Sequence, residues 1–145
     1  MNLPDYVSVE EVKRVCRELN ISDWTELEDA KASSDEARVI LSEVNVQEMD
    51  IDLEEFRQGL EVELEHGKRF KDANVTNNHP ILTGKIVLAH LKESLYYYKL
   101  LEVAELEGDL LKAIQTDQYS EVKRIYIRLL NAKMVLNQAE MTRLD

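Results

Sequence analysis

Glycine and proline are scarce in this chain, with four glycines and two prolines among 145 residues. Both residues are the usual makers of tight turns, which sandwiches and barrels of β-strands need in large numbers. The chain is 44% hydrophobic and 32% charged, a composition typical of a soluble globular protein rather than a disordered or membrane-spanning one. We therefore predict an all-α fold.

The charge balance excludes several classes of partner. Eighteen basic and 29 acidic side chains give a net charge of -11. Such a surface repels nucleic-acid phosphates and anionic lipid headgroups, and no uncharged run is long enough to span a bilayer. We therefore expect no nucleic-acid partner and no membrane partner. The single cysteine, Cys16, cannot form an intramolecular disulfide, which favours a reducing, cytoplasmic location.

Capping residues predict where the first helices begin. Ser8 precedes Glu11 by three residues, which is the spacing of a capping box, and the run Ser33-Ser34-Asp35-Glu36 opens a second helix. The two helices that start there are predicted to end near residues 19 and 45. We interpret residues 1–50 as a small N-terminal helical layer.

The central segment, residues 51–108, is predicted to hold a pair of long helices. Asp52 caps a helix over residues 53–66, which Gly67 is placed to end in a left-handed conformation. Residues 68–82 have no sustained apolar period, so they predict a loop in which His79 is exposed.

The second helix of the pair is predicted to be longer. Thr83 is its cap, and its apolar pattern continues unbroken from Gly84 to Leu106, before Gly108 interrupts it. The whole chain, residues 1–145, is then a single helical domain. It is a helical bundle with two long central antiparallel helices, the N-terminal layer and a C-terminal helix.

The C-terminal segment, residues 109–145, differs chemically from the rest. Residues 1–108 contain 24 acidic and 12 basic side chains, whereas residues 109–145 contain five and six. Its helix, residues 120–144, is amphipathic, so we expect it to pack on residues 1–108 of its own chain or of a partner, which makes a homo-oligomer through residues 109–145 possible. The side chains expected to be buried are Val122, Ile125, Tyr126, Leu129 and Leu136.

Two mirrored motifs are the only candidates for a functional site that the sequence offers. Glu63-x-x-His66 lies on the first central helix and His90-x-x-Glu93 on the second. If these helices pack antiparallel, the four side chains converge in one buried layer. Two carboxylates and two imidazoles suit a mononuclear site for Fe, Mn or Zn, and facing Glu-x-x-His motifs build di-metal sites in four-helix bundles. Tyr97 would then support the ligands from the second shell.

Two other interpretations of the same side chains remain open. The motifs can form a buried network with Tyr97 that fixes helix register, which is typical of a non-catalytic interaction or scaffold protein. Alternatively, His90 can be a general base oriented by Glu93, but the sequence offers no nucleophile or oxyanion hole to accompany it. We assign no catalytic residue.

The same region resembles a known family. The runs ELEHG, NVT, TGKI..AHL.E and a Tyr-Tyr pair are similar to the signature of an uncharacterised family of bacterial and archaeal domains of unknown function, over residues 36–107. The resemblance implies that Asn74 and Thr76 act together with the motif residues, as second-shell groups. It implies no activity. The chain departs from the family pattern at residues 78–79, where an acidic pair is usual, and at residues 95–96, where Pro-Asp is usual.

Overall fold

The computed structural model describes residues 7–144, which fold into helices and contain no strand. The predicted all-α class is therefore confirmed. Within the described residues, no helix has the length and apolar character needed to cross a membrane. The chain divides into two compact units, residues 1–95 and 96–145, and the expectation of a single domain over residues 1–145 stays a prediction. The helices are α1 (Val9–Glu18), α2 (Ser34–Val44), α3 (Leu53–Arg69), the short 3-10 helix η1 (Lys71–Ala73), α4 (Pro80–Glu93), α5 (Tyr97–Gln115) and α6 (Tyr119–Thr142).

Side-chain caps begin the first three helices, as the sequence predicts. The Ser8 hydroxyl accepts a hydrogen bond from the Glu11 amide at 3.1 Å, and Ser33 forms a complete capping box. The Asp52 carboxylate accepts from the amides of residues 54 and 55. Each cap satisfies amide groups that a helix cannot pair internally, which fixes where these helices start.

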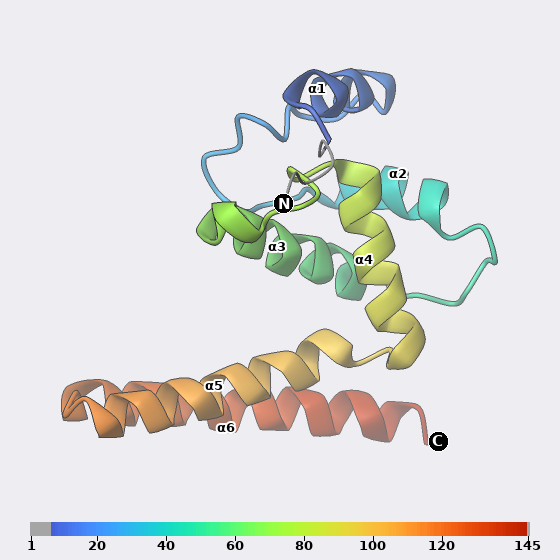
Figure 1. The fold of residues 1–145 in the computed structure, drawn as a ribbon. Coiled ribbons are helices and arrows are strands. Elements are labelled where there is room, and N and C mark those ends of the chain that lie inside the picture. Colours follow the sequence, from blue (N-terminus) through green and yellow to red (C-terminus); the bar gives the residue numbers. More distant parts are fainter. Residues whose placement is uncertain (1–6, 145) are drawn as a thin grey trace, which may run out of the picture. The chain divides into compact units, whose positions relative to one another are not determined.

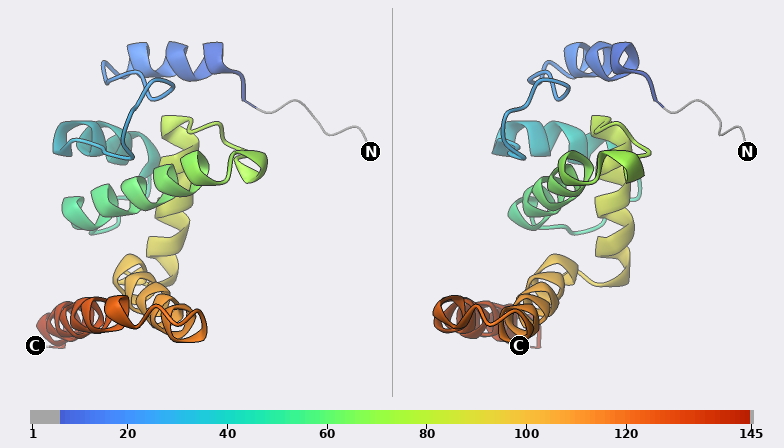
Figure 2. Two further views of the ribbon diagram at one scale, coloured as in Figure 1. Left: turned by 90° about the vertical axis from the view of Figure 1, so that its left-hand side faces the viewer. Right: turned by 60° about the vertical axis from the view of Figure 1, so that its left-hand side comes forward.

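The core of the first unit lies among α2, α3 and α4, which pack on one another. Figures 1 and 2 show α4 crossing α3 at a steep angle, and α2 beside them. α4 approaches α2 closely at Gly84, where a Cβ atom would lie 2.6 Å from a methyl group of Ile40, so only glycine fits there without a shift. The largest fully buried side chains include Trp24, Ile40, Phe56, Leu60, Leu64 and Leu91.

The prediction of one unbroken helix from Gly84 to Leu106 is wrong. α4 ends at Glu93, Ser94 is extended with φ -154° and ψ 128°, and α5 begins at Tyr97. Gly108, expected to interrupt the helix, lies inside α5. A glycine costs a helix only about 1 kcal/mol relative to alanine, which the packing of α5 can offset.

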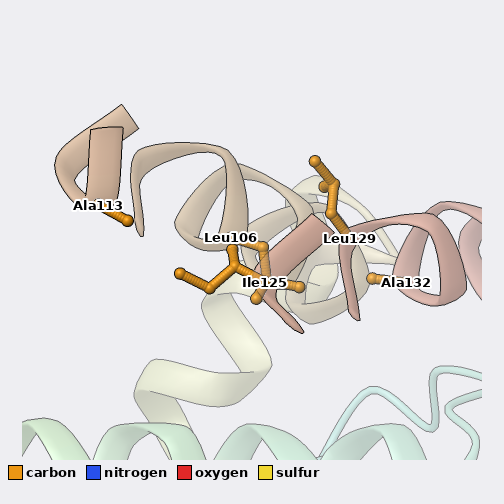
Figure 3. Close-up of a cluster of buried hydrophobic side chains, with 5 residues drawn as sticks. All are labelled: Leu106, Ala113, Ile125, Leu129 and Ala132. Carbon is orange, nitrogen blue, oxygen red and sulfur yellow. The ribbon is translucent and has the colours of Figure 1, made fainter. Parts of the chain in front are cut away.

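The second unit is a hairpin of α5 and α6, the long antiparallel helix pair of this chain (Figure 1). The turn between them contains Asp117 in a left-handed conformation, with φ 55°. The buried core of the hairpin is drawn in Figure 3 and consists of Leu106, Ala113, Ile125, Leu129 and Ala132.

The expected C-terminal helix is confirmed as α6, and Ile125, Leu129 and Leu136 are buried as predicted. Val122 is partly buried against the same core. Tyr126, however, is 51% exposed, so its predicted burial is wrong. A single helix, α5, covers only a narrow stripe of α6, and Tyr126 lies outside that stripe.

Candidate functional site

Gly67 does not end α3. The helix continues to Arg69, and no glycine in the described residues has a positive φ, so the predicted left-handed C-cap is wrong. A Cβ atom at Gly67 would lie 2.1 Å from the side-chain oxygen of Asn78 and 2.9 Å from the amide nitrogen of Asn74. Glycine is needed there because a loop approaches the helix closely.

That loop is a compact polar turn, residues 74–78, held on α3 by its own side chains. The side-chain nitrogen Nδ2 of Asn74 donates to the Gly67 backbone carbonyl at 3.1 Å and to the Asn78 side-chain oxygen at 2.9 Å. The Thr76 hydroxyl donates to the Asn74 oxygen at 3.2 Å and accepts from the Asn78 amide. Asn77 and Asn78 are both left-handed, a conformation that asparagine tolerates better than most residues.

His79 follows this turn and begins α4. Its ring nitrogen Nδ1 accepts from the amides of Ile81 and Leu82 at 3.2 and 3.4 Å, and Pro80 occupies the first helical turn. The side chain is buried, so the predicted exposed loop position is wrong. Burial lowers the pKa of His79, because a protonated imidazole would lose hydration there.

A cavity of about 340 Å³ lies beside α3, open to solvent on one side. Glu63 and His66, two of the predicted ligands, and Asn74 and Thr76, two of the predicted second-shell residues, all line it. The apolar part of the lining was not predictable from the sequence, because the close contact at Gly67 that brings residues 70–76 back onto α3 leaves no periodic signal. The remaining lining residues are Gly67, Phe70, Ala73, Val75, Thr83 and Ile86.

Glu63 is the central charged group of this site. Its carboxylate oxygens lie 3.3 Å from Nδ1 of His90 and 3.9 Å from Nδ1 of His66. The Glu63 side chain is only 16% exposed, whereas the two imidazoles are 30% and 44% exposed. The structure therefore brings three of the four predicted ligands together around one carboxylate, with the histidines at the edge of the unit rather than in a buried layer.

The fourth predicted ligand, Glu93, is exposed at the end of α4 and is not among the residues that line the cavity. The interpretation of Glu93 as a buried carboxylate in an apolar stripe is therefore wrong. Tyr97 belongs to the second unit. Among residues 7–144, no group of three or more His, Cys, Asp or Glu side chains is arranged to hold a metal ion.

Comparison with known proteins places the chain in a family without assigning it an activity. The family described as Protein of unknown function (DUF5661) matches residues 12–107, about two-thirds of the chain, so the chain belongs to this family. No curated protein and no solved structure matches the chain. The matched segment contains α2, α3 and α4 whole, with the cavity and the Glu63 cluster. It ends inside α5, so α6 lies outside the family match.

Proposed function

We propose that the first unit binds a small amine-bearing ligand in the cavity beside α3, with Glu63 as the group that recognises the amine. The observation that carries the proposal is that Glu63 presents a largely buried carboxylate to a cavity of about 340 Å³. This volume is within the range of small-molecule sites, about 300 to 1,000 Å³. A carboxylate only accepts hydrogen bonds, so it selects ligands that donate them.

The rest of the lining supports the same ligand chemistry. The side-chain nitrogen of Asn74 donates to Gly67 and Asn78, so this donor of the polar wall is already paired within the protein. Phe70, Val75 and Ile86 supply an apolar wall for the body of the ligand. Residues 1–95 contain 21 acidic and 11 basic side chains, so their field attracts cations.

A divalent cation, Fe, Mn or Zn, is the second candidate. It is favoured by the position of Glu63 within 4 Å of both imidazoles, since carboxylate and imidazole are common ligands of these ions. His66, His90 and Glu63 would be the ligands after their side chains rotate toward one ion. A third interpretation, a purely structural network in a non-catalytic interaction protein, predicts that neither amines nor metals bind.

Thermal melting decides among these three. A ligand that binds only the folded chain raises the free energy of unfolding by about 2.7 kcal/mol at a hundredfold excess over its Kd. We expect members of a panel of small primary amines to raise the melting temperature of the wild type. Glu63→Gln should abolish this effect because it removes the charge but keeps the shape. Glu65→Gln is the matched control, since Glu65 lies on the same helix and is exposed.

The metal candidate has its own outcome. Fe(II), Mn(II) or Zn(II) would raise the melting temperature, a chelator would reverse the shift, and His90→Ala would abolish it. A wild type that responds to no amine and no metal contradicts both candidates and leaves the structural network. An amine response that survives in Glu63→Gln contradicts the role of Glu63.

A further inference from the structure

The hairpin of α5 and α6 leaves many large apolar side chains exposed, and five of them lie together on one side. Lys133 on α6 and Glu107 on α5 form an ion pair at 2.7 Å, so these two residues lie on the same side of the hairpin and serve to define it. On α5, Leu100, Leu111 and Ile114 lie seven, four and seven residues from Glu107, so they point the same way as Glu107. Each of the three is at least 44% exposed.

On α6, Tyr126 and Leu130 lie seven and three residues before Lys133, so they continue the same surface. They are 51% and 45% exposed. We call Leu100, Leu111, Ile114, Tyr126 and Leu130 the apolar face of the hairpin. The opposite side is polar apart from Val135, and its exposed residues include Glu102, Glu105, Asp109, Lys112, Arg124, Arg128 and Asn131.

We propose that the apolar face is the interface of a homodimer, in which two copies of the hairpin pack face to face as a four-helix bundle. A helix in such a bundle buries a wider stripe than a helix in a hairpin, because it contacts neighbours on two sides. The apolar face lies beside the stripe that is already buried. A second hairpin would therefore extend the existing core instead of forming a separate one.

Charge favours a second copy on this face. The hairpin segment, residues 96–145, contains eight acidic and seven basic side chains, whereas residues 1–95 carry ten more acidic than basic ones. Two hairpins therefore approach each other without the repulsion that two first units would experience. Glu107 and Lys133 on the face have opposite signs and form an ion pair, so neither brings a net charge to the contact.

The available area also suits a dimer. α5 and α6 contain 19 and 24 residues, so at about 1.5 Å per residue and roughly 10 Å of width per helix the hairpin presents about 650 Å². Two copies then bury roughly 1,300 Å², within the range of about 1,200 to 2,000 Å² typical of stable interfaces. The dimer contact proposed here is independent of the ligand proposed for the first unit.

The experiment is sedimentation equilibrium of the full chain at micromolar concentrations. We expect the wild type to have twice the 16.8 kDa mass of one chain. The double variant Leu111→Glu, Leu130→Glu should be monomeric, with the dimer Kd raised more than about a hundredfold, because four charges would enter the interface. The double variant Asn131→Glu, Val135→Glu is the matched control, since it adds the same charge to the opposite side, and it should remain dimeric.

Circular dichroism of both double variants checks that the helices persist, since all four substituted side chains are exposed. A wild type that is monomeric throughout this concentration range overturns the proposal. If that monomer is destabilised by the Leu111 and Leu130 substitutions but not by the control, residues of the same chain cover the face instead. A dimer that survives the Leu111 and Leu130 substitutions overturns the proposal as well.

Discussion

The two units of this chain bury their apolar residues differently. The first unit encloses large side chains completely, with Phe56 and Leu60 at 0% exposure, and its three helices α2, α3 and α4 contact one another. The described part of the hairpin buries seven side chains, two of which are alanines, and leaves leucines, isoleucines and tyrosines exposed. Three crossing helices can enclose a side chain from several directions, whereas two helices share only one seam. The hairpin therefore has more to gain from a partner than the first unit has.

The largest expected effect tests the enclosed core. Phe56→Ala should lower the free energy of unfolding of the first unit by about 3 to 5 kcal/mol, because the unit cannot collapse around the cavity left behind. Leu129→Ala in the hairpin should cost about 2 kcal/mol, near the lower end for a buried leucine, because the hairpin can close around the gap. Trp24, the single tryptophan, lies in the first unit, so its fluorescence during urea denaturation follows that unit, while circular dichroism follows both. Equal losses from the two substitutions would contradict the difference in packing.

A pair of glycines gives an effect of opposite sign in the two units. Gly67→Ala should destabilise the chain by about 1 to 3 kcal/mol, because the added methyl group displaces Asn78 and Asn74 from α3. Gly108→Ala should stabilise it by about 0.5 to 1 kcal/mol, since its Cβ would meet nothing within 4 Å and alanine favours a helix. Denaturation midpoints measure both changes. A stabilising Gly67→Ala would show that the 74–78 turn is not held closely on the helix.

A further prediction concerns the cap of α4. His79→Ala should cost about 1 kcal/mol, the usual value of a lost N-cap. The pKa of His79 lies below the ordinary histidine value of 6.5 because the ring is buried. Between the lowered pKa of the folded chain and the ordinary value of 6.5 in the unfolded chain, the unfolded chain binds more protons than the folded chain. The free energy of unfolding therefore rises with pH in this window. The contribution of the neutral His79 ring to the free energy of unfolding is complete above about pH 6.5 and is lost as the pH falls from there through the lowered pKa of the folded chain.

His79→Asn separates the cap from the titration. Asparagine keeps a capping acceptor but does not gain a proton, so melting temperatures between pH 5 and 7.5 should vary less with pH in this variant than in the wild type. The nearby Glu11, 4.0 Å from the ring, partly opposes the lowered pKa and is retained in the variant. Identical pH profiles would exclude His79 as the titrating group.

Local chemistry was predictable from the sequence, and long-range contact was not. The caps at Ser8, Ser33 and Asp52 depend on residues within one helical turn, so their spacing alone places the helix starts. A glycine at position 67 suggests the end of a helix from sequence alone. In the structure its role is to leave room for Asn74 and Asn78, which lie in a turn that packs against α3. The sequence signals of Pro80 and an acceptor side chain just before it would have indicated the start of α4.

The candidate site was also predictable only in part. Glu63, His66 and His90 lie together because α3 and α4 are in contact, but they do not form the buried layer that the mirrored motifs predict. Glu93 does not join them, since α4 crosses α3 and its last residue points to solvent. The break after Glu93 contains no glycine or proline, and an apolar pattern continues through it. Periodicity counts spacing along the chain, so it cannot detect where a helix changes direction.

α6 carries two seven-residue repeats at once. The buried stripe, from Val122 through Leu129 to Leu136, advances by sevens, and so does the exposed row of Ile127, Met134 and Met141. An insertion or deletion far from a whole number of helical turns would rotate both rows away from their positions. Related chains that extend this hairpin should therefore differ in length by close to whole numbers of turns in each helix, such as about seven or eleven residues, with the turn at Asp117 displaced outward and the first unit unchanged.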